Sequence, residues 1–361
     1  MKKVAVLMSG GVDSSTSAYI LLKEGYNVFG VTLKLWNCDE VVYGDKQICC
    51  SPKDIYDAKN VCSSLGIKHY VLDFSKEFKE YIIETFCKKY LSGFTPNPCI
   101  LCNYKIKFEL VFERLKNLFD IDFIASGHYS KIIKFENKYF IAKAKDELKD
   151  QSYFLCRLSS KMLPYIVFPL EDFSKDKVRE IAKSAGIKVA DKKESFDLCF
   201  VPSGDYRKFL KLMGHEINKP GKIIDINTGK FLGYHKGYVN YTVGQRCGLG
   251  LKNVSSRMYV VKIEPKENIV YVGRQKDLYK DFLVAKDCVF YEKKEKIFKQ
   301  RLFAKIRYKS ELAECKVEPL GTNTVKVKFF IPQRAITPGQ YVVVYDEENK
   351  IILSGEIVNS S

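Results

Sequence analysis

Hydrophobic and polar positions follow one pattern over roughly the first 200 residues. Short continuous apolar runs, such as residues 4–8, alternate with segments that carry apolar residues at helical spacing, such as residues 14–24. Glycine follows several of the helical segments directly, as at Gly25. The pattern predicts further strands at 28–35, 69–74 and 122–126, and further helices at 54–65, 105–119 and 178–185. Alternating strands and helices predict a parallel sheet covered on both faces.

The pattern changes beyond about residue 205. Glycine turns become frequent, and short β-rich runs lie between them at 258–263, 269–272, 301–308, 324–330, 340–345 and 351–357. Residues 325–329 alternate apolar and basic side chains with a period of two. This pattern predicts one or two small antiparallel β modules, the last one a barrel. We therefore expect three domains, at 1–205, 206–280 and 281–361.

Composition narrows the class of protein. The chain has 361 residues, too many for one ordinary core, and its 46% hydrophobic content excludes a disordered protein. No apolar stretch approaches the ~18 residues of a membrane span, and Ser9-Gly10-Gly11 interrupts the apolar start before it could serve as a secretion signal. We therefore expect a cytoplasmic protein.

The formal net charge is +17, which indicates a polyanionic partner, most simply nucleic acid. A surface that is merely rich in lysine would give the same net charge.

Twelve cysteines in a cytosolic chain of this length do not indicate a disulfide framework. Most are expected to be small buried side chains. Zinc is disfavoured, because the adjacent pair Cys49-Cys50 lacks the usual ligand spacing. We interpret the following as structural: Cys38, Cys62, Cys87, Cys156, Cys247, Cys288 and Cys315.

The stretch MSGGVDSS, residues 8–15, follows the first predicted strand. A glycine-rich turn into a helix N-terminus presents backbone N–H groups that hold phosphate, and serine hydroxyls add donors. Asp13 adds a negative charge, which fits if Mg²⁺ bridges it to the phosphates. The chain has no G-x-x-x-x-G-K-[ST], and no G-x-G-x-x-G follows the first strand. The simpler alternative, a turn with one serine cap, does not need the whole string.

Residues 9–14, SGGVDS, resemble the phosphate loop of the N-type ATP pyrophosphatases. In that superfamily the loop binds ATP, the substrate oxygen is adenylated and pyrophosphate leaves. The motif does not choose among members, which include amide-forming synthetases and tRNA sulfur-insertion enzymes.

The stretch TPNPCILCN, residues 95–103, places two thiols at a predicted helix start. Asn97 is a good N-cap and Pro98 a good first helical residue. Cys99 and Cys102 then lie one turn apart on the same face. The helix N-terminus, with Lys105 and Lys107 nearby in sequence, should lower both thiol pKa values.

Several motifs together resemble the bacterial tRNA-specific 2-thiouridylases over essentially the whole chain. They are TPNPxxxCNxxIKF from Thr95, GHY at 127–129, KDQSYFL at 149–155, Ser195 with Cys199-Phe200, TxGQRxGLG at 242–250 and TPGQ at 337–340. The resemblance implies an α/β, parallel-sheet ATP-pyrophosphatase domain (adenine nucleotide alpha hydrolase-like), a small central β module and a C-terminal β-barrel. It also implies 2-thiolation of the wobble uridine, position 34, in the tRNAs for Lys, Glu and Gln.

The resemblance also implies roles for individual residues. The uracil C2 oxygen attacks the α-phosphorus of ATP, and Cys199 carries the incoming sulfur as a persulfide. Cys102 either releases hydrosulfide from this persulfide or resolves it, leaving a Cys102–Cys199 disulfide that a reductant reopens. Asp13 belongs to this catalytic set, and Asn97, Pro98 and Cys99 match the segment that meets the target base. Matching ATP-binding positions are Leu7, Met8, Ser9, Gly10, Gly11, Val12, Asp13, Ser14, Leu33 and Gly127. Matching tRNA-binding positions are His128, Lys149, Asp150, Gln151, Arg307, Tyr308 and Gln340.

Some alternatives stay open. Many relatives carry Asp at the position of Cys99, so Cys99, Cys102 and Cys199 could together hold a [4Fe–4S] cluster. For Arg307-Tyr308 the alternative is a solvated strand face, and for His128 a structural histidine. A small-molecule ATP pyrophosphatase would not need the basic C-terminal third, and the intact loop argues against a non-catalytic tRNA-binding or iron–sulfur protein. The family resemblance implies a cysteine desulfurase or sulfur-relay carrier as donor, no membrane partner, and a monomer.

Overall fold

The computed structural model describes residues 1–36, 52–190, 192, 198–201, 204–251 and 256–359. Two compact units can be distinguished. The first comprises Met1–Ile83, Pro98–Gly204 and Asn349–Ile351, and the second comprises Glu84–Asn97, Asp205–Glu348 and Ile352–Ser361. None of the helices in the described part of the chain is long and apolar enough to cross a membrane.

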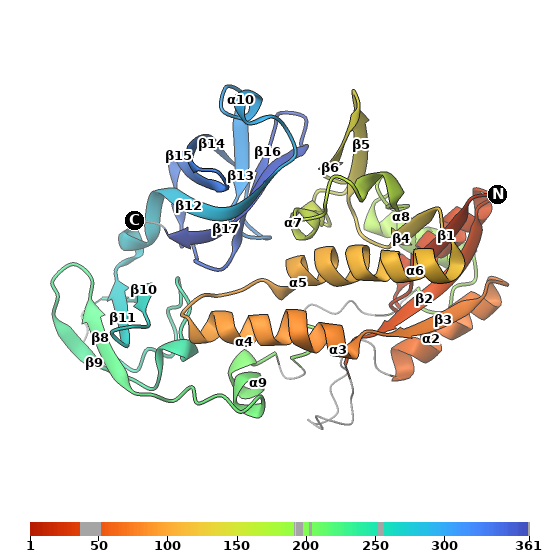
Figure 1. Cartoon of the computed structure of the whole chain (residues 1–361). Coiled ribbons are helices and arrows are strands. Elements are labelled where there is room, and N and C mark those ends of the chain that lie inside the picture. The colour runs from red at the N-terminus through yellow and green to blue at the C-terminus, as the bar shows by residue number, and fades with distance from the viewer. Residues whose placement is uncertain (37–51, 191, 193–197, 202–203, 252–255, 360–361) are drawn as a thin grey trace. The chain divides into compact units, whose positions relative to one another are not determined.

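The first unit contains the predicted parallel sheet, in the strand order β3-β2-β1-β4-β7 (Figure 1). The strands are β1 (Lys3–Leu7), β2 (Asn27–Lys34), β3 (His69–Asp73), β4 (Phe123–Ser126) and β7 (Ile166–Val167). After β1 the chain first adds β2 and β3 on one side, and then adds β4 on the other side. The strand order therefore reverses between β1 and β4, and ligands of open parallel sheets bind at the carboxyl ends of the strands at such a point.

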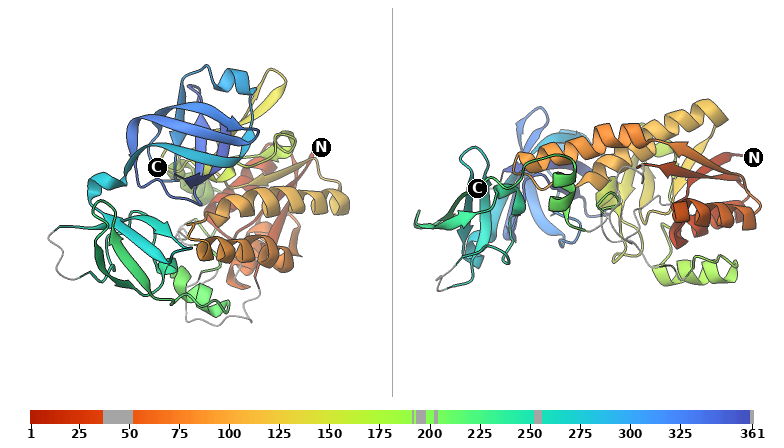
Figure 2. Two further views of the ribbon diagram at one scale, coloured as in Figure 1. Left: turned by 60° about the vertical axis from the view of Figure 1, so that its left-hand side comes forward. Right: turned by 90° about the horizontal axis from the view of Figure 1, so that it is seen from below.

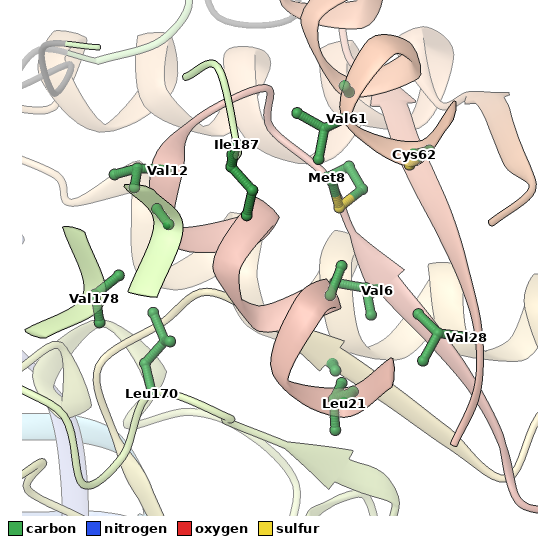
Figure 3. Packing of buried hydrophobic residues seen from close by; sticks show 14 of the residues in the cluster. Val6, Met8, Val12, Leu21, Val28, Val61, Cys62, Leu170, Val178 and Ile187 are labelled. Carbon is green, nitrogen blue, oxygen red and sulfur yellow. The ribbon is translucent and has the colours of Figure 1, made fainter. Parts of the chain in front are cut away.

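Helices α1 (Val12–Lys23) and α2 (Pro52–Ser64) form the crossovers that the sequence predicts, and α8 (Lys175–Ser184) also packs in this unit. Their apolar residues join those of the strands in one buried cluster (Figure 3). Met8, at the end of β1, lies beside Val61 and Cys62 of α2 in this cluster. The core thus packs directly against the loop that follows β1.

The predicted helix at 105–119 is longer in the structure. Helical residues begin at Pro98 and continue through α5 (Pro98–Leu101), the π-helical η3 (Cys102–Leu110) and α6 (Val111–Phe119). A second helical stretch was not predicted: α3 (Ser75–Phe78) and η2 (Lys79–Ile83) belong to the first unit, and α4 (Glu84–Leu91), which continues them, belongs to the second. The first unit also contains β5 (Lys131–Phe135), β6 (Lys138–Ala142), α7 (Ser152–Leu155) and η4 (Leu163–Tyr165).

The second unit contains two β structures. The first is a four-stranded sheet in the order β10-β11-β8-β9, formed by β8 (Gly221–Asp225), β9 (Phe231–His235), β10 (Tyr259–Glu264) and β11 (Ile269–Gly273). The prediction of a purely antiparallel module is wrong here, because β11 pairs with β8 in parallel. The unit also contains α9 (Tyr206–Leu212), η5 (Tyr238–Asn240) and η6 (Gln275–Leu278).

The predicted barrel is confirmed as a closed sheet in the order β12-β15-β14-β13-β16-β17 (Figures 1 and 2). Val325, Val327 and Phe329 are buried in its core, whereas the lysines between them are not, so the period-two alternation is also confirmed. The elements are β12 (Tyr279–Phe290), α10 (Lys294–Ile297), β13 (Leu302–Lys305), β14 (Ala313–Gly321), β15 (Thr324–Arg334), β16 (Tyr341–Tyr345) and β17 (Ile351–Asn359).

Candidate functional site

A cavity of about 250 Å³ opens at the carboxyl ends of β1, β2 and β4, where the strand order reverses. Its walls include many of the predicted ATP-binding residues, with two of the predicted tRNA-binding residues. The lining residues are Leu7, Met8, Ser9, Asp13, Ser14, Val31, Leu33, Leu35, Lys107, Ser126, Gly127, His128 and Gln151. Sequence reasoning did not place Val31, Leu35, Lys107 and Ser126 in this cavity, since only the packing of the strands and of η3 (Cys102–Leu110) brings them there. Gly10, Gly11 and Val12 shape the loop without lining the cavity.

The loop after β1 enters α1 without a side-chain cap. The N-cap residue is Gly11, and no side chain accepts from the first backbone N–H groups. The simple serine cap is therefore wrong: the Ser14 and Ser15 hydroxyls instead donate to the Gly11 carbonyl, at 3.2 and 2.8 Å. An uncapped helix start beside a cavity offers N–H groups with partial positive charge, which is the arrangement that suits an anion.

Two glycines are required by close backbone approach. Gly10 has φ +69°, and a Cβ there would lie 2.5 Å from the Asp54 carbonyl oxygen. A Cβ on Gly127 would lie 2.7 Å from the Ser14 amide nitrogen. Any larger residue at either position would push the loop or the first turn of α1 out of place.

Asp13, which is half-buried, forms an ion pair with a buried lysine that the sequence did not predict. Both carboxylate oxygens accept from Lys175 Nζ, at 2.7 and 2.8 Å, and Oδ1 also accepts from the Tyr129 hydroxyl at 2.9 Å. Lys175 stands in the first turn of α8, far away in sequence and without a motif that would mark it. Asp13 is the one carboxylate among the residues that line the cavity, but its oxygens already have a cationic partner. Mg²⁺ would fit this carboxylate only if Lys175 released an oxygen.

Lys192 ties the same loop to α2. Its Nζ donates to the Gly10 carbonyl at 3.1 Å, to Asp54 at 2.8 Å and to Asp57 at 2.7 Å. Desolvation lowers the pKa of this ammonium, but the hydrogen bonds with the two carboxylates outweigh it and raise the pKa overall. Lys192 lies seven residues before Cys199, so one side chain joins the phosphate loop to the segment that leads toward that thiol.

The helix of the C-x-x-C stretch begins at Pro98, as predicted, with Cys99 half-buried in its first turn. The expected lowering of the Cys102 pKa is wrong. Burial raises the pKa of this thiol, because its side chain is desolvated, and the charge of Lys107 only partly opposes the effect. Lys105 does not help, since its Nζ pairs with Glu109 at 2.5 Å. Cys102 is therefore a protonated thiol near neutral pH.

Cys199 lies half-buried in a turn. The next residue, Phe200, is buried and packs edge-on against Phe78 of α3, with ring centroids 5.8 Å apart. Ser195, which shares the motif of Cys199, lies outside the described residues. Within the described ranges, no group of three or more His, Cys, Asp or Glu residues is arranged to hold a metal ion, so Cys99, Cys102 and Cys199 are not gathered as cluster ligands.

The predicted tRNA-binding residues of the first unit divide into two groups. His128 and Gln151 line the cavity, and burial lowers the pKa of His128 well below 6.5, with Lys107 adding to the effect. The imidazole is therefore neutral, and its Nδ1 lies 2.7 Å from the Ser126 hydroxyl. Asp150 is buried and accepts from the Ser152 hydroxyl at 2.8 Å and from the Ala144 amide at 3.1 Å, which fixes the local loop. Lys149 is half-buried beside it.

The remaining predicted tRNA-binding residues lie in the second unit. The strand β13 ends at Lys305, so Arg307 and Tyr308 occupy the following turn and not a strand face. The Arg307 guanidinium donates to the Arg334 carbonyl. The Gln340 side-chain amide donates to the Thr95 carbonyl at 2.7 Å, close in sequence to Asn97.

The cysteines interpreted as structural are mostly buried. Burial raises the pKa of Cys62 and Cys87 to about 11, and that of Cys315 to about 12. Cys156 and Cys288 are buried too. Cys247 differs, because it is exposed in a glycine-rich turn. Cys38, Cys49 and Cys50 lie outside the described residues.

Comparison with known families accounts for this combination of a nucleotide-type loop and distant thiols. Residues 2–203 match the tRNA methyl transferase HUP domain, residues 207–274 the tRNA methyl transferase PRC-barrel domain, and residues 280–357 the aminomethyltransferase beta-barrel domain. The fold and site therefore define a HUP-domain, nucleotide-binding enzyme of tRNA modification.

The similarity to particular relatives is nearly full length. The chain is 43% identical to the tRNA-specific 2-thiouridylase MnmA 1 of Caldanaerobacter subterraneus subsp. tengcongensis, covering 99% of this chain and 97% of that protein. It is 44% identical to the tRNA-specific 2-thiouridylase MnmA of Carboxydothermus hydrogenoformans, covering 95% and 94%. A solved 4-thiouridine synthetase in complex with RNA and ATP is 15% identical, with a TM-score of 0.35 over 59% of this chain and 50% of that one. The chain belongs to the tRNA-specific 2-thiouridylase family.

Proposed function

We propose that this protein replaces the C2 oxygen of the wobble uridine, position 34, by sulfur in the tRNAs for Lys, Glu and Gln, with ATP as the activating substrate. The observation that carries this proposal is the shared helical segment η3. Lys107 lines the cavity beside the uncapped start of α1, and Cys102 begins the same segment. The nucleotide-type cavity and the thiol are therefore parts of one local structure.

The first half of the reaction is adenylation. The cavity holds ATP, with its phosphates near the N-terminus of α1 and its base toward Leu33 and Gly127. The uracil C2 oxygen attacks the α-phosphorus, pyrophosphate leaves, and the oxygen becomes part of an AMP leaving group. Asp13 would be the carboxylate that holds a Mg²⁺ ion accompanying the phosphates, provided that Lys175 freed one of its oxygens, and the ion would there neutralise phosphate charge.

The second half is sulfur transfer. A cysteine desulfurase, directly or through a carrier, loads Cys199 as a persulfide. The Cys102 thiolate attacks the Cys199 sulfur and forms the Cys102–Cys199 disulfide, while hydrosulfide leaves and displaces AMP from C2. Alternatively, the outer persulfide sulfur attacks C2 first, and Cys102 then resolves the linkage. In both routes an external reductant supplies two electrons to reopen the disulfide.

The surroundings of Cys102 set one requirement on this chemistry. Because burial raises the pKa of this thiol, it is not a ready nucleophile. Loss of its proton is therefore coupled to occupation of the site, which brings a base or moves the thiol closer to Lys107.

In the proposed complex the target base meets Asn97, Pro98 and Cys99. The rest of the tRNA contacts His128, Lys149, Asp150, Gln151, Arg307, Tyr308 and Gln340.

The test is nucleoside mass spectrometry of tRNA from a deletion strain complemented with this chain. We expect 2-thiouridine with the wild-type protein and none with Cys199→Ala, whereas Cys247→Ala, which changes an exposed cysteine, should restore it fully. Restoration by Cys199→Ala would overturn the persulfide role.

Iron and sulfide counts on anaerobically purified protein decide the cluster alternative, because the persulfide route requires an active, iron-free enzyme. We expect a cytoplasmic monomer.

A further inference from the structure

The segment 92–97, here called the connector, joins the end of α4 at Leu91 to the start of α5 at Pro98. Its Phe94 amide returns to α4, donating to the Lys89 carbonyl at 3.0 Å, and Pro96 has no N–H. Thr95 instead bonds to the barrel. Its amide donates to the Pro338 carbonyl at 2.9 Å, and its carbonyl accepts from Gln340 Nε2 at 2.7 Å.

The partner of Thr95 is a tight turn over Thr337-Pro338-Gly339-Gln340, here called the TPGQ turn. The Gln340 amide donates to the Thr337 carbonyl at 3.2 Å, and Gly339 has φ +91°, as a type II turn requires at its third residue. The turn is fixed to β17 by two further bonds, from the Gly339 amide to Ile357 and from the Ile357 amide to Gln340, both 2.8 Å. It is therefore part of the barrel wall.

Close approach between the turn and the connector depends on glycine. A Cβ on Gly339 would lie 2.8 Å from the Thr95 amide nitrogen and 2.9 Å from the Phe94 Cβ. A second tie lies nearby, because Lys89 pairs with Glu356 of β17 and lies over the Phe94 ring. The end of α4 and the connector are thus both anchored to the barrel.

Packing alone does not hold the connector. A cavity of about 860 Å³ lies against it, lined by residues 92–95 on one side and by 336–338 on another. On the side that borders this space the connector has no packing partner, so its hydrogen bonds add a constraint that packing does not supply there. The two bonds of Thr95 supply that constraint.

We propose that Gln340 and Gly339 are positioning residues for sulfur transfer, acting through Thr95 on the segment Asn97–Cys99 and on Cys102. This inference rests on the proposed function. Thr95 is two residues from Asn97, and Pro96 and Pro98 restrict the backbone between them. A displacement of Thr95 is therefore passed along the chain to the start of α5. The Thr95 bond needs only one of the two amide hydrogens of Gln340, so this role is compatible with a tRNA contact.

The test combines hydrogen exchange with kinetics on the full-length protein. In the absence of tRNA, Gln340→Ala and Gly339→Ala should speed exchange of the Thr95 amide by about fivefold to tenfold, the effect expected for the loss of about one hydrogen bond. In thiolation assays with excess tRNA, kcat should fall by a similar factor, while KM for ATP stays unchanged. A loss confined to KM for tRNA would overturn the positioning role.

Matched variants separate this role from general effects. Gln333→Ala removes a glutamine amide that donates to the nearby Ile331 carbonyl, and Gly229→Ala adds a methyl group at φ +69° with open space around it. Both should behave like wild type. If Gly339→Ala does not fold, Gln340→Ala and Gln340→Asn, whose amide is too short to reach Thr95, test the positioning role instead.

Unchanged Thr95 exchange in these variants would overturn the proposal. If wild-type protein makes no 2-thiouridine, the proposed function fails instead, and the exchange result still reports on the connector.

Discussion

The cavity at the end of β1 and the surroundings of Cys102 are constrained in different ways. The phosphate loop is a contiguous stretch whose own glycines and serines carry its motif, and Lys175, Lys192 and Gly127 contact it from elsewhere in the chain. Cys102 is buried by the fold, and the connector before its helix is held by a barrel turn more than 200 residues away. The loop can therefore be recognised from one stretch of sequence, whereas the surroundings of Cys102 depend on tertiary contacts that only the structure shows.

The largest expected effect tests the nucleotide end through Lys175. Lys175→Met leaves the partly exposed Asp13 carboxylate without its cation, and losing charged hydrogen bonds of this kind costs about 2–3 kcal/mol of unfolding free energy. The double variant Asp13→Asn/Lys175→Met should recover most of that stability and remain inactive. Urea unfolding and thiolation assays on all four proteins measure this. Wild-type stability of Lys175→Met would show that the pair is not structural.

Gly127→Ala tests the close packing of the cavity wall. The added Cβ would crowd the Ser14 amide and the Asp13 side chain, at 2.7 and 2.9 Å. Overpacking of this kind costs about 1–3 kcal/mol, so ATP should bind about 10- to 100-fold more weakly by calorimetry. Gly66→Ala, where the methyl group meets open space, is the control. Equal ATP affinity in both variants would contradict a prebuilt cavity.

Lys192→Met tests the link between the phosphate loop and the segment before Cys199. Removing this ammonium leaves Asp54 and Asp57 without their shared partner and releases the Gly10 carbonyl. We expect a loss of about 1–2 kcal/mol in stability and about tenfold weaker ATP binding. The exposed Lys188→Met serves as control. If ATP affinity is unaffected, Lys192 does not support the loop.

The smallest effect is a pH dependence from His128. Burial lowers its pKa in the folded protein, so the unfolded chain takes up the proton first as pH falls. The unfolding free energy should therefore fall as pH drops below about 6.5, the ordinary pKa of histidine. His69 and His235 contribute in the same direction, because burial also lowers their pKa values. In His128→Asn the loss between pH 7.5 and 5.5 should be smaller than in the wild type, and an unchanged slope would contradict the assignment.

The difference between the two regions also explains what sequence could predict. Strand and helix periodicity located the parallel sheet, and the loop motif located the cavity, because both signals are local. Lys175 and Lys192 carried no signal, since their acceptors lie more than 100 residues away. The pKa of Cys102 was predicted in the wrong direction for the same reason. A helix N-terminus is visible in the sequence, but the burial that outweighs it comes from the fold.

The burial of Cys102 has a further consequence, for the survival of the enzyme between reaction cycles. Peroxide attacks thiolates and reacts slowly with thiols, and over-oxidation to sulfinic or sulfonic acid destroys a catalytic cysteine. Cys102 is 7% exposed and its raised pKa keeps it protonated, so both access and reactivity are low before substrate arrives. In the reaction proposed above, the desolvation that keeps Cys102 from reacting early would therefore also protect it from oxidative damage.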